Sequence, residues 1–268
     1  MRKVFLYRSF ESDNLQSELH AAQKAGFTLI DNRDDLHSED IVLPRFYPFW
    51  NYLKDEFDQI NVSIAAPYGQ HDWLADIRQW YPVVKSFTPR TWLSIADVIE
   101  DDATGPFFVK GIDKSLKHDF NKFCYAENLV ELPKTLAALQ DALPVEQPLV
   151  IREFKKLSSY GNNPVGGAPL AHEFRVFVYD GYIVSQGFYW QSLIAKEGIT
   201  NFSVTPPQDF LQDVIDLVGD KAKFYSLDVA LTDEGEWIVI ELNDGFLSGL
   251  CDVDQDSHYM NLFALLGK

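Results

Sequence analysis

Cysteine is scarce in this chain, and several sequence patterns that define common enzyme classes are missing. The 268 residues include only Cys124 and Cys251, with no CxxC pair and no Cys/His spacing typical of a zinc site. The sequence contains no HExxH, no GxSxG and no GK[ST] pattern. These absences argue against a disulfide framework, a zinc protease, a hydrolase with a nucleophile elbow and a P-loop nucleotidase.

Positive charge and long apolar runs are also in short supply. The chain has 23 Lys and Arg against 40 Asp and Glu, a net charge of −17. We therefore expect no general binding to nucleic acid or to anionic membranes, although a local basic pocket for a phosphorylated ligand stays open. No run of ~18 apolar residues predicts a membrane span. The first residues, MRKVFLYRSFESD, lack a secretory hydrophobic region, so the cytoplasm is the expected location.

What the chain does contain is apolar and aromatic residues in the pattern of a mixed α and β protein. Apolar residues make up 46% and aromatic residues 14%, enough for a sizeable core. Strand Lys3–Tyr7, helix Asn14–Ala25 and strand Phe27–Ile30 predict an α/β opening. An acidic run at residues 100–102, followed by Gly105-Pro106, indicates a boundary. We predict a small, reduced N-terminal α/β domain over residues 1–103 and a larger α+β unit over residues 104–268.

Several weaker elements are predicted between these landmarks. Helix Asp72–Tyr81 is expected to end at Pro82. A second helix is expected within Pro89–Glu100, with Thr88 or Thr91 at its start. Residues 158–169 (SSYGNNPVGGAP) are rich in Gly, Asn and Pro and predict a loop, either a lid or a linker.

The segment Phe224–Gly245 (FYSLDVALTDEGEWIVIELNDG) predicts a β-hairpin that brings two acids together. With a loop at residues 233–236, Asp228 lies directly opposite Glu241. Alternation places Glu241 and Asn243 on one face, together with Trp237 and Val239. Neighbouring carboxylates repel, and a divalent cation with oxygen ligands would relieve that repulsion. The alternative, a solvated acidic face, is equally open from spacing alone.

Three cationic side chains stand at strand positions along the rest of the larger unit. Lys110 ends the strand PFFVK, where a solvated strand end is an alternative to a ligand role. Arg152 closes the buried strand PLVIR, and a phosphate contact and a plain ion pair are equally open. Arg175 lies in the alternating strand EFRVFVY, on the face of Glu173, where a structural salt bridge to Glu173 or Glu241 is the alternative.

In order and spacing, these segments resemble the ATP-grasp superfamily. HEFRVFVYDGYIV and IVIELNDG are similar to a clade of small members marked by arginines and a lysine in the nucleotide site. The resemblance covers roughly residues 85–267 and implies two α+β lobes that grip ATP. It further implies that Lys110, Arg152 and Arg175 are catalytic, that Glu153 and Phe154 belong to a hinge that holds adenine through its main chain, and that Lys110, Arg152, Glu153, Phe154, Arg175, Asp228, Glu241 and Asn243 bind the cofactor.

The resemblance also implies a reaction. Asp228, Glu241 and Asn243 would hold Mg²⁺, and ATP would phosphorylate a carboxylate to an acylphosphate that an amine or related nucleophile then attacks, releasing ADP and phosphate. A kinase-like phosphotransferase and a non-catalytic nucleotide-binding module are the alternatives. The second substrate, an unknown small-molecule or peptide carboxylate and amine, is not named by the sequence. The oligomeric state is not specified by the sequence, and a homodimer is one possibility. One departure from the superfamily is that Lys85 is only a poor match to a second lysine found in many members.

Overall fold

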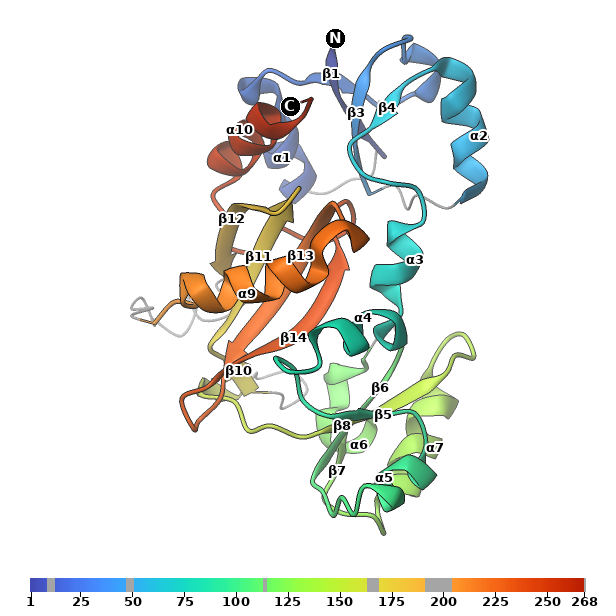
Figure 1. Ribbon diagram of the computed structural model, residues 1–268, viewed down its shortest axis with the longest axis vertical. Coiled ribbons are helices and arrows are strands. Elements are labelled where there is room, and N and C mark those ends of the chain that lie inside the picture. Colours follow the sequence, from blue (N-terminus) through green and yellow to red (C-terminus); the bar gives the residue numbers. More distant parts are fainter. Residues whose placement is uncertain (9–12, 47–50, 113–114, 163–168, 191–203, 268) are drawn as a thin grey trace.

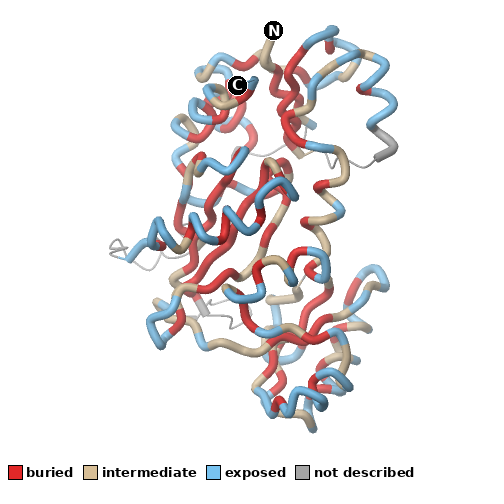
Figure 2. The backbone as a smooth tube through the Cα atoms, in the orientation of Figure 1, coloured by how far each residue is buried: buried red, intermediate tan, exposed pale blue. Residues whose placement is uncertain are grey.

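The computed structural model describes residues 1–8, 13–46, 51–112, 115–162, 169–190 and 204–267. Three parts follow one another along the long axis of the molecule (Figure 1). A sheet near both chain termini lies at one end, an antiparallel sheet lies in the middle, and a smaller sheet lies at the other end. Buried residues run through all three parts (Figure 2). One apolar cluster joins the N-terminal sheet to the middle sheet, a second lies mainly in the middle sheet, and a third lies in the smaller sheet.

The N-terminal part is a parallel four-stranded sheet with the strand order β2-β1-β3-β4. The predicted strand–helix–strand opening is confirmed, whereas β3 and α2 were not predicted. Pro44 lies inside β3 and weakens its sequence signal, because proline is unusual within a sheet. The elements of this part are β1 (Lys3–Tyr7), α1 (Asp13–Ala25), β2 (Thr28–Ile30), η1 (Arg33–Asp35), β3 (Ile41–Arg45), α2 (Asn51–Ile60) and β4 (Ser63–Ile64).

The last helix of the described chain returns to this N-terminal sheet. Helix α10 (Gln255–Leu265) packs against α1, so the first and last elements share one core. Tyr259 and Phe27 meet edge to face, and Phe177 from the middle sheet belongs to the same buried cluster. The N-terminal sheet and the middle sheet therefore share a continuous core.

The middle sheet is antiparallel, with the strand order β12-β11-β13-β14. Its strands and the helix that covers one face are β11 (Glu173–Tyr179), β12 (Tyr182–Phe188), α9 (Gln208–Val218), η4 (Gly219–Lys221), β13 (Phe224–Leu231) and β14 (Trp237–Asp244). A tight turn joins β11 to β12, where Asp180 and Gly181 both have positive φ, 52° and 79°.

Alternation along these strands gives the middle sheet two different faces. Val176, Leu227 and Val239 point to the side of α9, whose Leu211 and Ile215 complete that core. The opposite face carries polar side chains at one end and aromatic side chains at the other. The aromatic end joins the N-terminal core. The polar end faces the smaller sheet and supplies the site.

The smaller part is an antiparallel sheet with the strand order β5-β8-β6-β7. Its elements are β5 (Thr91–Trp92), α5 (Ile95–Glu100), β6 (Phe107–Gly111), η2 (Lys117–Asp119), α6 (Phe120–Phe123), β7 (Tyr125–Ala126), α7 (Leu132–Ala142) and β8 (Leu149–Glu153). Helices α3 (Gln70–Ala75) and α4 (Ile77–Val84) connect the N-terminal sheet to it.

Two predicted helices differ from those observed. Pro82 does not end a helix but lies inside α4, because the chain breaks earlier, at Asp76, whose side chain accepts a bond from the amide of Arg78 and caps α4. The helix predicted within Pro89–Glu100 begins only at Ile95, after the N-cap Ser94, and residues 91–92 form β5 instead.

The predicted loop at residues 158–169 is wrong in part. Residues 159–162 form β9 (Ser159–Asn162), which pairs antiparallel with β10 (Pro169–Ala171). Gly161 has a φ of 133°, which glycine alone adopts readily, so the composition that predicts a loop here permits an irregular ribbon. Residues 163–168, on which the lid prediction rests, lie outside the described residues.

The division of the chain at residue 103 stays a prediction. Strand β5, before that position, pairs with β8 beyond it, and Trp92 of β5 packs edge to face against Phe107 of β6. Across the described residues, no helix combines the length and the apolar character that a membrane span requires.

Candidate functional site

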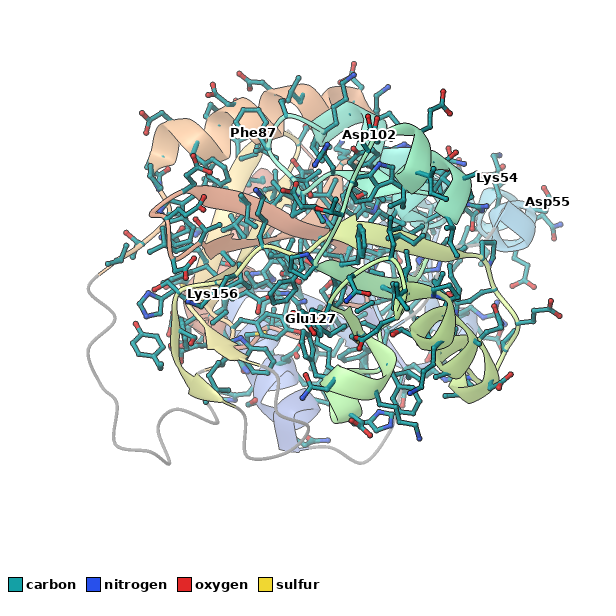
Figure 3. All side chains as sticks on the ribbon, turned by 90° about the horizontal axis from the view of Figure 1, so that it is seen from below. Lys54, Asp55, Phe87, Asp102, Glu127 and Lys156 are labelled. Carbon is teal, nitrogen blue, oxygen red and sulfur yellow. The ribbon has the colours of Figure 1, made fainter. Side chains whose placement is uncertain are left out.

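A small set of charged side chains is buried between the middle sheet and the smaller sheet. Lys54, Asp102 and Lys156 are exposed, and Figure 3 shows Lys54 at the edge of the molecule. In contrast, the following are at most 8% exposed: Lys110, Arg152, Glu173, Arg175 and Asp228. Burying charge is costly unless the charges are paired or serve a ligand, so this group marks the candidate site.

The predicted pairing of Asp228 with Glu241 across the hairpin is confirmed. Asp228 of β13 pairs with Glu241 of β14, and Ser226 pairs with Asn243. The loop differs from the prediction, because Leu231 pairs with Trp237 and the turn spans five residues. A β-bulge at Ile240 then offsets the longer turn by one position and returns Glu241 to its place opposite Asp228.

The same bulge overturns one part of the face assignment. Trp237 and Val239 do not share a face with Glu241 and Asn243, as strict alternation predicts. Val239 is fully buried in the core beneath α9, while Glu241 and Asn243 face the cleft. An extra residue in one strand shifts the alternation by one place, and nothing in the run WIVIELND announces where it lies.

Arg175 makes a two-pronged ion pair with Asp228. Its Nε and Nη2 donate to Oδ1 and Oδ2 at 2.8 and 2.7 Å, and Nη1 donates to the carbonyl of Gly249 at 2.9 Å. The ring of Tyr189 lies 4.9 Å from the guanidinium. Burial opposes the charge, yet Asp228 outweighs it and holds the pKa of Arg175 above its usual value. The alternative salt bridge predicted for Arg175, to Glu173 or Glu241, is wrong.

Lys110 reaches across the cleft from the smaller sheet. Its ammonium donates to Oε1 of Glu241, and the lysine is 4% exposed, so the alternative of a solvated strand end is wrong. Burial by itself would raise the pKa of Glu241, but the charge and hydrogen bond of Lys110 lower it. One contact therefore joins β6 of one lobe to β14 of the other.

Arg152 donates to uncharged oxygen atoms of the protein. Its Nη1 donates to the carbonyl of Ile240 at 2.9 Å, and its Nη2 donates to the hydroxyl of Thr88 at 2.6 Å. Burial lowers the pKa of Arg152 to about 10. It forms no ion pair with any residue that the structure describes. The guanidinium instead holds the carbonyl at the bulge in β14, and it lines the adjoining cavity.

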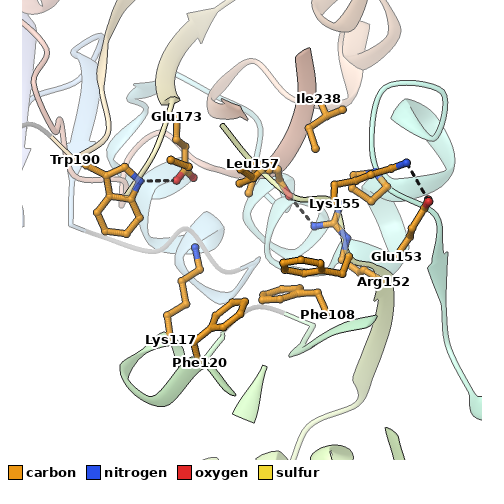
Figure 4. Close-up of a pocket in the computed structure, with 14 residues that line it drawn as sticks. Phe108, Lys117, Phe120, Arg152, Glu153, Lys155, Leu157, Glu173, Trp190 and Ile238 are labelled. Atoms are coloured by element: carbon orange, nitrogen blue, oxygen red, sulfur yellow. Dashed lines mark hydrogen bonds and ion pairs between the residues drawn. The ribbon is translucent and has the colours of Figure 1, made fainter. Parts of the chain in front are cut away.

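A cavity of about 690 Å³, open to solvent, lies beside these charges. Figure 4 shows Phe108 and Phe120 on one side, with Ile238 and Leu157 opposite, and polar groups at both ends. The apolar walls suit a flat aromatic ring. Glu153 forms ion pairs with Lys155 at 3.0 Å and with Arg90 at 3.7 Å at its rim.

The predicted hinge lies at this cavity, but its two amides are already used. The amide of Glu153 donates to the carbonyl of Arg90 at 2.8 Å, and that of Phe154 donates to the carbonyl of Pro106 at 3.0 Å. No backbone hydrogen bond is made by the amide of Lys155 within the described chain. Lys155 also lines the cavity, so its main chain is the first after β8 that is available to a ligand.

Three residues of the site lay outside the predicted set. Glu173 accepts a bond from the indole of Trp190 at 2.9 Å, and Lys117 points toward that pair (Figure 4). Burial raises the pKa of Glu173 despite the charge of Lys117. The alternation of EFRVFVY placed Glu173 on the same face as Arg175, but Lys117 stands in a polar segment that has no distinguishing period.

Lys85 is exposed at the end of α4 and does not line the cavity.

The hairpin of β13 and β14 carries oxygen donors of the kind that a divalent cation requires. Two carboxylates, Asp228 and Glu241, stand side by side, and Asn243 approaches Asp228 with its amide nitrogen at 3.4 Å from Oδ2. No group of three or more His, Cys, Asp or Glu side chains suited to a metal occurs among the residues described. A small number of protein oxygens is enough to bind Mg²⁺, because this ion usually keeps waters and substrate phosphates as its other ligands. Asn243 would need to turn its amide to offer oxygen.

Comparisons with known proteins bear on this arrangement. A profile of the family described as ATP-grasp domain, R2K clade family 3, matches residues 99–262, more than half of the chain. The chain belongs to this family. The ATP-grasp fold and the clade expected from the sequence are thereby confirmed. No curated protein sequence matches the chain significantly.

Solved structures with the same fold match along almost the whole chain. The D-cycloserine synthetase DcsG is 11% identical, with a TM-score of 0.62 and 98% of each chain covered. The ATP-grasp ligase PsnB, complexed with a minimal precursor, Mg and ADP, is 11% identical, with a TM-score of 0.59 and coverage of 98% of this chain and 96% of that one. The RimK domain ATP-grasp protein from Sphaerobacter thermophilus is 11% identical, with a TM-score of 0.55 and coverage of 98% and 99%. These likenesses extend the fold to the N-terminal part, outside the family match.

Proposed function

We propose that this ATP-grasp protein is an ATP- and Mg²⁺-dependent ligase that joins a carboxylate to an amine or related nucleophile. The observation that carries the proposal is that Arg175 binds Asp228 and Lys110 binds Glu241 close along their strands to Glu173 and Ile240, which line an aromatic-walled cavity. Buried cations beside paired carboxylates suit a metal-bound triphosphate. The cavity between Phe108 and Ile238 is the proposed place for the adenine.

The residues of the chain divide the work of phosphoryl transfer. Lys110 and Arg175 are proposed to turn from their carboxylates toward the phosphates and to neutralise the charge that develops on the transferred group. Asp228, Glu241 and Asn243 are proposed to hold Mg²⁺, which would supply positive charge to the phosphates when bound. Glu153 and Phe154 lie at the adenine end, with Lys155 offering its amide. Arg152 is proposed to position Ile240 and to approach the acylphosphate.

The bond-forming step needs no protein nucleophile. A substrate carboxylate attacks the γ-phosphorus, ADP leaves, and the amine then attacks the acylphosphate carbonyl and expels phosphate. Positioning of the three reactants and neutralisation of charge supply most of the rate enhancement. A structure of PsnB is complexed with the precursor peptide PsnA2 and AMPPNP, and DcsG is named a D-cycloserine synthetase. We therefore propose peptide and amino-acid carboxylates as the first substrates to test.

The test is an ATP-turnover assay with a panel of peptide and amino-acid carboxylates and amines. We expect ADP, free phosphate and an amide product in equal amounts. Asp228→Asn and Glu241→Gln should each lower turnover roughly 100-fold or more, because each removes a ligand charge for Mg²⁺. Asp102→Asn, at an exposed position, is the matched control. A phosphorylated product without free phosphate, or unchanged turnover in both variants, would contradict the proposal.

A further inference from the structure

Lys117 differs from the other cations of the site in its contacts. Arg175 donates to Asp228, and Lys110 donates to Glu241. Lys117 lines the cavity from η2 but forms no ion pair within 4.0 Å with any described residue. Its ammonium points toward Glu173 and Trp190 in Figure 4.

Among the carboxylates of the described site, Glu173 is the one that forms no ion pair. Glu173, Asp228 and Glu241 are the carboxylates, and the carboxylate of Glu173 receives the neutral indole N–H of Trp190 rather than a cation. Burial disfavours the charge of Lys117, yet Glu173, Glu241 and Asp228 outweigh it and raise its pKa. Lys117 is therefore an ammonium ion held by the field of these acids without being locked to one of them.

A lysine in this situation can exchange partners more readily than its neighbours. Arg175 and Lys110 must break direct bonds to carboxylates before they can bind another anion. Lys117 is carried by a short 3₁₀ turn after β6 and has donors left for a ligand in the cavity. The ligand that belongs beside a carboxylate-bound Mg²⁺ is a phosphate group.

We infer that Lys117 is an additional nucleotide-binding residue, which stands in for the divalent cation beside the acids without ATP and binds the phosphates when Mg²⁺ and ATP enter. This inference rests on the proposed nucleotide site and adds a residue and an exchange of charges to it. It makes two predictions of opposite sign. Without Lys117, the nucleotide should bind more weakly, and a divalent cation alone should bind more tightly.

The experiment uses the full chain and two ligands, measured by calorimetry. Lys117→Met should weaken binding of AMPPNP with Mg²⁺ roughly 10- to 100-fold, the loss expected for one charge-assisted bond. The same variant without nucleotide should bind Mn²⁺ roughly 3- to 10-fold more tightly, because a positive charge beside the acids is gone. Lys122→Met, an exposed lysine close by in sequence, is the matched control and should change neither affinity.

The outcomes separate this inference from the proposed function. If wild-type protein fails to bind AMPPNP with Mg²⁺, the proposed function itself is wrong. If wild-type protein binds but Lys117→Met binds both ligands as wild type does, only the inference is wrong. A loss of nucleotide affinity without the gain for Mn²⁺ overturns the exchange of charges. Lys117→Gln gives the same two readings if the Met variant does not fold, and Lys117→Arg should keep nucleotide affinity within about threefold.

Discussion

At the scale of single residues, the cationic side chains of the site are held by carboxylates of the same site. Arg175 is bound at both prongs by Asp228, and Lys110 is bound by Glu241. Without a metal or nucleotide, these pairs remove the repulsion between neighbouring acids that the hairpin register creates. Arg175 and Lys110 therefore supply the positive charge that the neighbouring carboxylates of Asp228 and Glu241 require.

The pairing of Arg175 with Asp228 predicts an asymmetric effect on stability. Arg175→Met should lower the free energy of unfolding by about 3–5 kcal/mol, because it leaves a carboxylate buried and unpaired. The double variant Arg175→Met/Asp228→Leu should recover more than about 1 kcal/mol of that loss. Urea denaturation measures both.

Lys54→Met, which breaks an exposed pair with Asp58, is the control and should leave the free energy of unfolding essentially unchanged. A double variant no more stable than the single one would show that the buried pair does not act as described.

Individual site residues could be predicted from the sequence to an uneven degree. Asp228, Glu241 and Arg175 stand in strands with clear alternation, so their common location follows from the pleat. Lys117 and Trp190 follow no period, and only the folded chain brings them to Glu173. Their roles depend on the path of irregular segments, which a single sequence does not specify.

At the scale of elements, the bulge at Ile240 orients the side chain of Glu241 toward the cleft, opposite Asp228. It lets Val239 fill the core beneath α9 while Glu241 faces the cleft. The carbonyl of Ile240 accepts a bond from Arg152, which belongs to β8 of the smaller sheet. The two lobes are therefore joined at the strand that carries Glu241 and Asn243.

This contact predicts the effect of replacing Arg152. Arg152→Met should lower the free energy of unfolding by about 2–3 kcal/mol, because it leaves the carbonyl of Ile240 and the hydroxyl of Thr88 without their donor. AMPPNP affinity should fall less than it does in Lys110→Met, since Arg152 holds the neutral Ile240 carbonyl and Thr88 hydroxyl, whereas Lys110 is proposed to turn toward the phosphates. Calorimetry and urea denaturation of both variants provide the comparison. A larger affinity loss for Arg152→Met, with unchanged stability, would instead assign it to the phosphates.

The strands with clean alternation were predictable, and the short irregular elements were not. β11, β13 and α9 follow from period-2 and period-3.6 patterns that burial enforces. The bulge, the ribbon of β9 and β10, and the helix that continues through Pro82 depend on tertiary contacts. Each of these is a place where packing overrides the local preference of the chain.

At the scale of the whole molecule, the N-terminal sheet is tied to the site by buried polar groups. Arg45 of β3 donates to both oxygens of Glu18 at 2.7 and 3.0 Å and to the carbonyls of Phe246 and Ser248. Tyr259 of α10 donates to Glu18 at 2.6 Å. The segment after Asn243 is thereby anchored to the N-terminal part.

The junction between α10 and β12 predicts a dependence of stability on pH. Burial lowers the pKa of His258 from its usual 6.5 to about 3, and its ring contacts the hydroxyl of Ser185 at 2.7 Å. The unfolded chain therefore binds a proton first, so stability is lost as pH falls from about 6.5 toward 3. At pH 5 the loss from this group amounts to about 2 kcal/mol.

His258→Phe should flatten the decline between pH 7 and pH 5, as measured by urea denaturation at each pH. His20→Gln, at an exposed position, serves as the control and should retain the wild-type slope. An unchanged slope in His258→Phe would show that another group sets the acid limit.

The overall arrangement was only partly accessible from the sequence. The ATP-grasp family followed from the order of Lys110, Arg175 and the Asp228–Asn243 hairpin, and the family match confirms it. The continuous core of α1, α10 and Phe177 could not be predicted, because it joins residues from opposite ends of the chain. Contacts of that kind leave no local periodic signal.

The most direct measurement is anomalous diffraction from crystals grown with AMPPNP and Mn²⁺. We predict a manganese peak between the side chains of Asp228, Glu241 and Asn243, with phosphate oxygens bridging it to Lys110 and Arg175 and with adenine beside Phe108. A nucleotide bound elsewhere, or manganese with no contact to Asp228 and Glu241, would contradict the central claim.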